Sequence, residues 1–178
     1  MSTIKVSTIS PLGTDATKTI TVGSAGDTIA GAGSMVPAFE ASTGSQTVSD
    51  ATVTKISLAT ETFDTDGCYD TSTYRFTPTI AGKYFVYTQA FFEESANFNR
   101  LYNTTIRIRK NGSDITNGIL SFVSNNSSYS SAQSMNFNCI VSMNGSSDYV
   151  ESFGYVDVSS GTPLIKNAIF GSYRIIGA

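Results

Sequence analysis

One strand in this sequence is apolar on both of its faces, and this feature limits the folds that the chain can adopt. Residues 84–92 read YFVYTQAFF, and side chains alternate between the two faces of a strand. Antiparallel sheets usually leave one face in water, so we expect this strand to need a second cover besides its own core. Its two apolar sets are Tyr84, Val86, Ala90 and Phe92 on one face, and Phe85, Tyr87 and Phe91 on the other.

The segment before this strand has the pattern of an antiparallel hairpin. Residues 74–77 read YRFT and form a short strand candidate, and Pro78 and Gly82 then interrupt the pattern. A strand, a Pro/Gly turn and a second strand in this order predict that the two strands pair with each other.

The chain from Phe39 onward predicts a sandwich of about ten short antiparallel strands. Residues 104–110 alternate two isoleucines inward with two arginines outward, and Asn111-Gly112 is a strong hairpin turn. The last two expected strands are apolar on parts of both faces, as the aromatic strand is. The further strands are expected at residues 52–63, 115–123, 134–143, 148–158 and 168–177.

The first 36 residues differ from the rest, because they contain no aromatic residue and two glycine-rich stretches, 23–26 and 31–34. We therefore divide the chain into an extended attachment arm, residues 1–36, and a sandwich domain, residues 37–178. An arm of this kind can add strands to a neighbour. We expect its aliphatic side chains to make the attachment: Ile4, Val6, Ile9, Ile20, Val22 and Ile29.

Composition and charge exclude several classes of function. The net charge of −3 offers no basic patch for nucleic acid, and no apolar run approaches the ~20 residues that cross a bilayer. The N-terminus lacks the apolar centre of a secretory signal, so we expect synthesis in a cytoplasm and no membrane partner.

The chain contains no histidine, which removes Ser-His and Cys-His catalytic pairs and imidazole metal sites. The carboxylate pairs Asp64/Asp66, Glu93/Glu94 and Asp148/Glu151 have no spacing that predicts a catalytic cleft. The run from Asp64 to Gly67 resembles the start of a calcium loop but lacks the later ligands, so a turn is the better interpretation. We expect no enzyme activity, no cofactor and no metal.

Two cysteines, Cys68 and Cys139, do not make a disulfide framework. Cys139 falls on the apolar face of its strand and reads as a small buried side chain, whereas Cys68 lies in a turn-rich segment and is expected to be partly exposed. A bridge between them is the less favoured alternative.

Several motifs also follow one another in a familiar order: Phe39-Glu40-Ala41, residues 55–63, Tyr74-Arg75-Phe76-Thr77, Ala81–Val86, Arg109–Gly112, residues 149–158 and Phe170–Tyr173. In this order they resemble the tumour necrosis factor (TNF)-like jelly roll, in the variant of complement C1q globular heads. The resemblance covers about residues 38–178. It implies a ten-strand antiparallel jelly roll that assembles as a homotrimer, with aromatic residues buried along the threefold axis.

Eukaryotic members usually carry a signal peptide and a collagen stalk, and we expect neither in this protein. Its Asn/Ser/Thr-rich texture is similar to that of small structural proteins of tailed bacteriophages, some of which carry this jelly roll. By this analogy we expect a virion protein on the capsid surface, a trimeric decoration or cement protein whose arm binds the major capsid protein or another virion protein. The alternative is a receptor-binding tip of a head or tail fibre that recognises a host glycan or protein. A third hypothesis is a free, soluble signalling-type ligand, which the missing export signal disfavours.

The aromatic and aliphatic side chains of the doubly apolar strands are the expected trimer contacts. Which sheet face lies on the axis stays open at this point. The expected contacts are Tyr84, Phe85, Val86, Tyr87, Phe91, Phe92, Tyr149, Phe153, Tyr155, Phe170, Tyr173 and Ile175.

Overall fold

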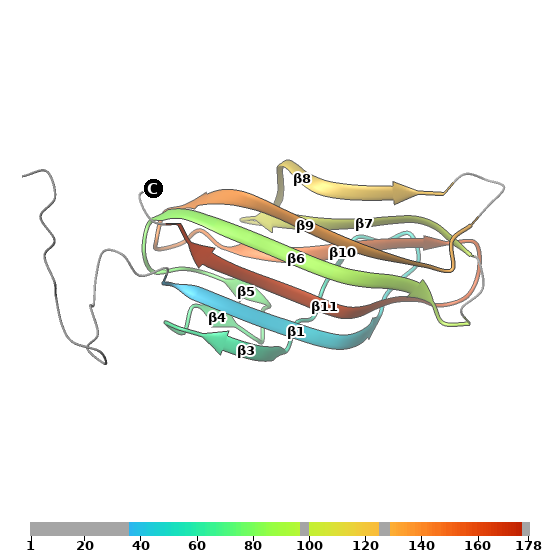
Figure 1. Ribbon diagram of the computed structural model, residues 1–178, viewed down its shortest axis with the longest axis horizontal. Helices are drawn as coiled ribbons and strands as arrows, with labels where there is room; N and C mark the ends of the chain where they lie inside the picture. Colours follow the sequence, from blue (N-terminus) through green and yellow to red (C-terminus); the bar gives the residue numbers. More distant parts are fainter. Residues whose placement is uncertain (1–35, 97–99, 125–128, 176–178) are drawn as a thin grey trace, which may run out of the picture. The chain divides into compact units, whose positions relative to one another are not determined.

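The computed structural model of the protein describes residues 36–96, 100–124 and 129–175, which form a sandwich of two antiparallel sheets (Figure 1). The predicted all-β sandwich is confirmed. No helix in these ranges is long and apolar enough to cross a membrane. The five-stranded sheet has the order β3 (Thr60–Asp64), β1 (Ala38–Thr47), β11 (Pro163–Arg174), β6 (Gly82–Glu94), β9 (Ala132–Met143). The six-stranded sheet has the order β4 (Tyr69–Asp70), β5 (Arg75–Phe76), β10 (Val150–Val158), β7 (Leu101–Lys110), β8 (Ser113–Val123), and β2 (Thr54–Lys55) pairs with β10.

Aromatic rings from both sheets meet in the core between them. Phe39 of β1 stacks on Phe76 of β5 and on Tyr69 of β4, with 4.5 Å between ring centroids in each pair. Phe170 of β11 meets Phe39 edge-on at 5.1 Å. The side chains of Phe39, Phe76 and Phe170 are fully buried, so the centre of the sandwich is an aromatic cluster.

The predicted strand 104–110 is confirmed as part of β7, and Ile106 and Ile108 are fully buried. Asn111 and Gly112 both have positive φ, 53° and 79°, and Lys110 pairs with Ser113 across the turn. Positive φ at both central residues is the type I′ turn geometry that an Asn-Gly pair favours.

The predicted hairpin between residues 74–77 and the aromatic strand is wrong. β5 pairs with β4 and β10 in one sheet, whereas β6 pairs with β9 and β11 in the other. Phe76 and Tyr84 enter the core from opposite sheets, with their ring centroids 5.8 Å apart. Both rings can be buried only if residues 77–81 cross from one sheet to the other, so core packing overrides the local turn signal.

The predicted strand 52–63 is also divided between the two sheets. β2 pairs with β10, and β3 pairs with β1. Ile56 and Leu58 lie between these two short strands, where both side chains are fully buried. The isoleucine and leucine therefore mark the crossing of the chain through the core, and not one face of a continuous strand.

The last strand begins at Pro163, five residues before the predicted start at 168. The pairing of β11 with β6 shifts register between Lys166 and Ile169, and Asn167 has a φ of 47°. A bulge of this kind hides the period-two pattern at the start of the strand.

Both cysteines are free. Cys68 is buried, contrary to the expected partial exposure, and this burial raises the pKa of its thiol. Cys139 packs at the margin of the core, where burial raises its pKa to about 11. Neither thiol is favoured as a thiolate nucleophile at neutral pH.

The sandwich has two distinct ends. β1 begins beside the end of β11, with Ala38 paired to Tyr173, and β6 begins beside the end of β9, with Gly82 paired to Met143. We call this the arm end, because residues 1–35 precede it in the chain. The opposite, distal end carries the connections that follow β6, β8 and β10.

The aromatic cluster predicts a large difference between two Phe→Ala substitutions. Phe76→Ala removes a fully buried ring and should lower the free energy of unfolding by about 3–5 kcal/mol. Phe63→Ala is the matched control, since the Phe63 side chain is 44% exposed, and it should change stability far less. Urea unfolding at one fixed protein concentration measures both, and equal losses would contradict this description of the core.

Candidate assembly surface

The outward face of the five-stranded sheet carries an apolar row near the arm end. Tyr173 of β11, Phe85 of β6 and Ile140 of β9 are successive cross-strand partners. The rings of Phe85 and Tyr173 lie 5.3 Å apart, and both are half-buried. Ile140 is 62% exposed, so water covers the end of this row in the single chain.

A second row, one pleat further from the arm end, holds a tyrosine flat against the sheet. Tyr87 lies opposite Gly171, where a Cβ atom would come within 2.3 Å of the tyrosine ring. The Tyr87 hydroxyl donates to Oε2 of Glu40 at 2.8 Å, so the side chain bridges β6, β11 and β1. Burial, followed by the Glu40 hydrogen bond, raises the pKa of Tyr87, which therefore stays a neutral donor.

The distal half of the same face is polar. The next rows contain Gln89 beside Asn136, and then Phe91 beside Ser134 and Lys166. Lys166 forms an ion pair with Glu93, so the charges of this half balance each other. The face thus changes along the strands, from apolar near the arm end to amide- and hydroxyl-rich at the distal end.

A separate apolar strip lies along β8, the edge strand of the six-stranded sheet. Its members are Ile119 and Val123, which share one face of the strand and are 42% and 58% exposed, whereas Leu120, 40% exposed, points to the opposite face. β8 lies on the same lateral side of the sandwich as β9, the edge strand that carries Ile140 (Figure 1). Exposed apolar side chains on an edge strand are typical of a surface that pairs with another chain.

The outward face of β10, by contrast, is covered by the chain itself. The Arg75 guanidinium carbon lies 4.1 Å from the centroid of Tyr149, and that of Arg109 lies 4.3 Å from the centroid of Phe153. Glu151 lies between the rings and is 2% exposed. It accepts a hydrogen bond from Arg75 at 2.9 Å and forms an ion pair with Lys55. On the outward face of β10, cationic side chains of the same chain therefore cover the aromatic rings, where the sequence led us to expect another subunit.

All of the expected trimer contacts except Ile175 therefore fall into three groups. Phe85, Tyr87, Phe91 and Tyr173 lie on the outward face of the five-stranded sheet. Tyr84, Val86, Phe92 and Phe170 are fully buried between the sheets, and they build the core of a single chain. Tyr149, Phe153 and Tyr155 lie on the other outward face, and Ile175 follows β11 and donates its N–H to the Lys83 carbonyl at 2.8 Å.

The expected attachment residues lie outside the described residues: Ile4, Val6, Ile9, Ile20, Val22 and Ile29.

Sequence reasoning missed Ile140 and Gly171. Ile140 is the one apolar side chain among the polar positions 134, 136, 138 and 142, an exception that could have marked it. Gly171 carries no local signal, because its role depends on the ring of Tyr87 from another strand.

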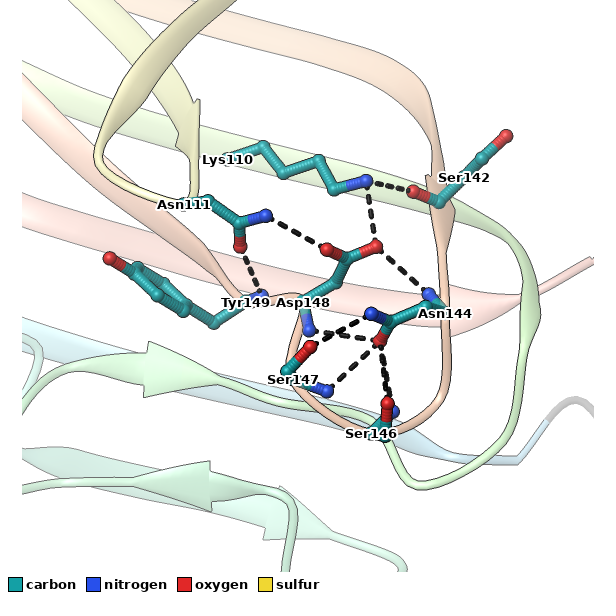
Figure 2. A network of polar contacts seen from close by, with 8 residues as sticks. All are labelled: Lys110, Asn111, Ser142, Asn144, Ser146, Ser147, Asp148 and Tyr149. Carbon is teal, nitrogen blue, oxygen red and sulfur yellow. Dashed lines mark hydrogen bonds and ion pairs between the residues drawn. The ribbon is translucent and has the colours of Figure 1, made fainter.

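A polar network fixes the loop between β9 and β10 at the arm end (Figure 2). Oδ1 of Asn144 accepts the backbone N–H groups of Ser146, Ser147 and Asp148, and these hydrogen bonds close a turn at Asn144-Gly145. The Asp148 carboxylate accepts hydrogen bonds from the Asn144 backbone at 2.9 Å and from the Asn111 amide at 2.8 Å, and an ion pair from Lys110 at 2.7 Å. The network ties the β7–β8 turn to this loop.

No group of three or more acidic or cysteine side chains among the described residues could hold a metal ion. The pair at Asp64 and Asp66 is a turn, in which Asp64 accepts the backbone N–H groups of Asp66 and Tyr69 at 3.2 and 2.6 Å.

The fold is also that of known structures. The globular domain of zebrafish complement 1qA protein is similar at 17% identity with a TM-score of 0.54, over 78% of this chain and 97% of that one. The Eiger TNF structure from S. frugiperda is similar at 13% identity with a TM-score of 0.52, over 79% of this chain and 93% of that one. No protein-family model and no curated protein matches the sequence. The chain has the TNF-like, C1q-like jelly-roll fold, as its motifs led us to expect.

The Asp148 network predicts a pH-dependent contribution to stability. The hydrogen bonds from Lys110 and then Asn111 lower the pKa of Asp148 below its unfolded value, which is about 3.9. The carboxylate therefore stabilises the fold above this unfolded value, and its contribution is lost as the pH falls through the lower folded pKa. Asp148→Asn should lower the urea midpoint at pH 7, and the difference from the unmodified protein should shrink as the pH falls through the folded pKa of Asp148. A difference that is constant with pH would contradict the role of the charge.

Proposed function

We propose that the chain forms a homotrimer through the apolar half of the five-stranded sheet's outward face. The observation that carries this proposal is the row of Tyr173, Phe85 and Ile140, which ends on a side chain that is 62% exposed. An aromatic row that is only half-buried on a sheet face is typical of an interaction surface, and another copy of the chain would remove its apolar area from water.

The apolar strip on β8 supplies the complementary surface. In a heterologous contact, the strip of Ile119 and Val123 on one copy packs onto the aromatic row of the next. Because each copy offers one face and one edge, such contacts form a ring when the rotation from one copy to the next closes, and a filament when it does not. The TNF-like fold supports three as the number of copies.

The proposed biological role is that of a non-enzymatic virion protein, a capsid decoration protein on the virion surface. Three arms, residues 1–36, would leave one trimer together and bind the major capsid protein or another virion protein. Three weak attachments on one particle combine into a strong one through their high effective concentration. The histidine-free composition and the glycine-rich, aromatic-free arm support this role.

The receptor-binding tip remains the second candidate, and one observation favours it. At the distal end Leu101 pairs with Ser130, and the ring of Tyr102 meets that of Tyr129 at 6.1 Å. Tyrosine among Ser and Asn side chains is typical of adaptable recognition surfaces. These residues lie at the distal end of the sandwich, which is proposed to face a partner on a host surface.

Charge substitutions on β6 separate assembly from folding. Phe85→Asp should give a folded single chain, because an unpaired carboxylate cannot be buried against a neighbour. Tyr84→Asp should unfold the protein, since the Tyr84 ring is fully buried inside one chain. Thr71→Asp, on an exposed turn, is the control that should leave assembly unchanged. Sedimentation and thermal unfolding distinguish these outcomes, and a Phe85→Asp protein that assembles normally would refute this interface.

Removal of the arm tests attachment separately. Deleting residues 2–34 spares Pro37, whose carbonyl accepts the backbone N–H of Arg174 at 3.3 Å, and should leave the assembly intact. The shortened protein should no longer bind virions in a co-sedimentation experiment. Retained virion binding would place the attachment surface on the jelly roll, and binding to host cells without virions would favour the receptor alternative.

A further inference from the structure

The polar half of the outward sheet face contains a hollow of about 210 Å³. Its walls are Gln89, Ala90 and Phe91 of β6, Ser134 of β9 and Asn167 of β11. Pockets for drug-sized ligands measure about 300–1,000 Å³, so a ligand here is the size of one small ring.

The hollow exists because β11 is bulged beside it. The register of β11 and β6 shifts between Lys166 and Ile169, and Asn167 lies inside the shift with a φ of 47°. A bulge leaves one residue out of the ladder and redirects its side chain, and such bulges are frequent beside binding sites. Asparagine is one of the few residues that adopts this left-handed backbone readily.

Three polar side chains around the hollow have no hydrogen-bond partner within the part of the chain that the structure describes. They are the amides of Gln89 and Asn167 and the hydroxyl of Ser134. Together they offer donors and acceptors in close proximity to the half-buried ring of Phe91. An aromatic wall with amide and hydroxyl groups beside it matches a ligand that has an apolar face and several hydroxyl groups.

The charge of the site selects among such ligands. The charged side chains at its border, Lys166 and Glu93, form an ion pair with each other. Among the described residues that border the hollow, no unpaired cation therefore favours a carboxylate, sulfate or phosphate on the ligand. We propose that this hollow binds one neutral sugar unit, a hexopyranose or its N-acetylamino form, of a glycan.

The site is independent of the proposed trimer contact. The apolar row of Phe85 lies near the arm end, whereas the hollow lies beyond Gln89 toward the distal end. One small site of this kind binds a free sugar weakly, with a Kd on the order of 1 mM. Three sites on one particle would strengthen binding to a glycan-coated surface. The biological role of the sugar site rests on the proposed receptor-binding function. The sugar-binding chemistry rests only on the side chains around the hollow.

Asn167→Gly is the most discriminating variant. Glycine keeps the positive φ and removes the whole amide-bearing side chain, so the bulge is retained. Asn117→Gly is the matched control. Asn117 of β8 also has a positive φ, 60°, but it belongs to the six-stranded sheet, whereas the hollow lies on the five-stranded sheet. Phe91→Ala removes the aromatic wall.

The experiment titrates the full-length protein with methyl glucoside, methyl galactoside, methyl mannoside and N-acetylglucosamine, followed by amide chemical shifts in NMR spectra. We expect at least one of these sugars to shift the amide signals of residues 89–91 and 134, and Asn167→Gly and Phe91→Ala to weaken its binding at least tenfold. Asn117→Gly should bind as the unmodified protein does. Absence of binding by all four sugars, equal binding by Asn167→Gly, or tighter binding of glucuronic acid would each overturn the proposal. The mass of the same sample reports on the trimer, so failure of the sugar site and failure of the proposed assembly are distinguished.

Discussion

The alternation of large apolar side chains on both faces of β6 is the constraint on which the rest of the structure depends. Its inward set, with Tyr84 and Phe92 fully buried, joins the aromatic cluster between the sheets. Its outward set cannot enter that core, because a strand has only one face toward each layer. How these remaining rings are covered determines the character of the outward face near the arm end.

The protein covers its outward rings in two different ways. On β10, Arg75, Arg109 and Lys55 lie over Tyr149 and Phe153, and the buried Glu151 neutralises part of their charge. The aromatic rings of this surface are therefore covered by side chains of the same chain. On β6, Tyr87 is held flat by Gly171 and Glu40, but the neighbouring row ends on the exposed Ile140. In the proposed assembly, only the second surface is buried by another copy of the chain.

Much of the fold could be predicted from the sequence, because alternation and turn chemistry are local. The β7 strand, its Asn-Gly turn and the doubly apolar β6 strand are examples. What could not be predicted is which sheet each strand joins. Phe76 and Tyr84 are close in the sequence but enter the core from opposite layers, and no local pattern records this. For the same reason the expected contacts mixed core residues such as Phe170 with surface residues such as Tyr173, since periodicity separates two faces without saying which one is inside. Gly171 and the bulge at Asn167 depend on neighbouring strands and carry no signal of their own.

The central claim is that the outward aromatic row is buried between copies of the chain in a threefold assembly. The mass of the intact, unmodified protein under native conditions tests this claim most directly. One chain has a mass of 18.9 kDa, so the account predicts a single species of three chains, about 57 kDa, that persists on dilution. A species of one chain at the same concentrations, with the row of Tyr173, Phe85 and Ile140 open to solvent, would contradict it.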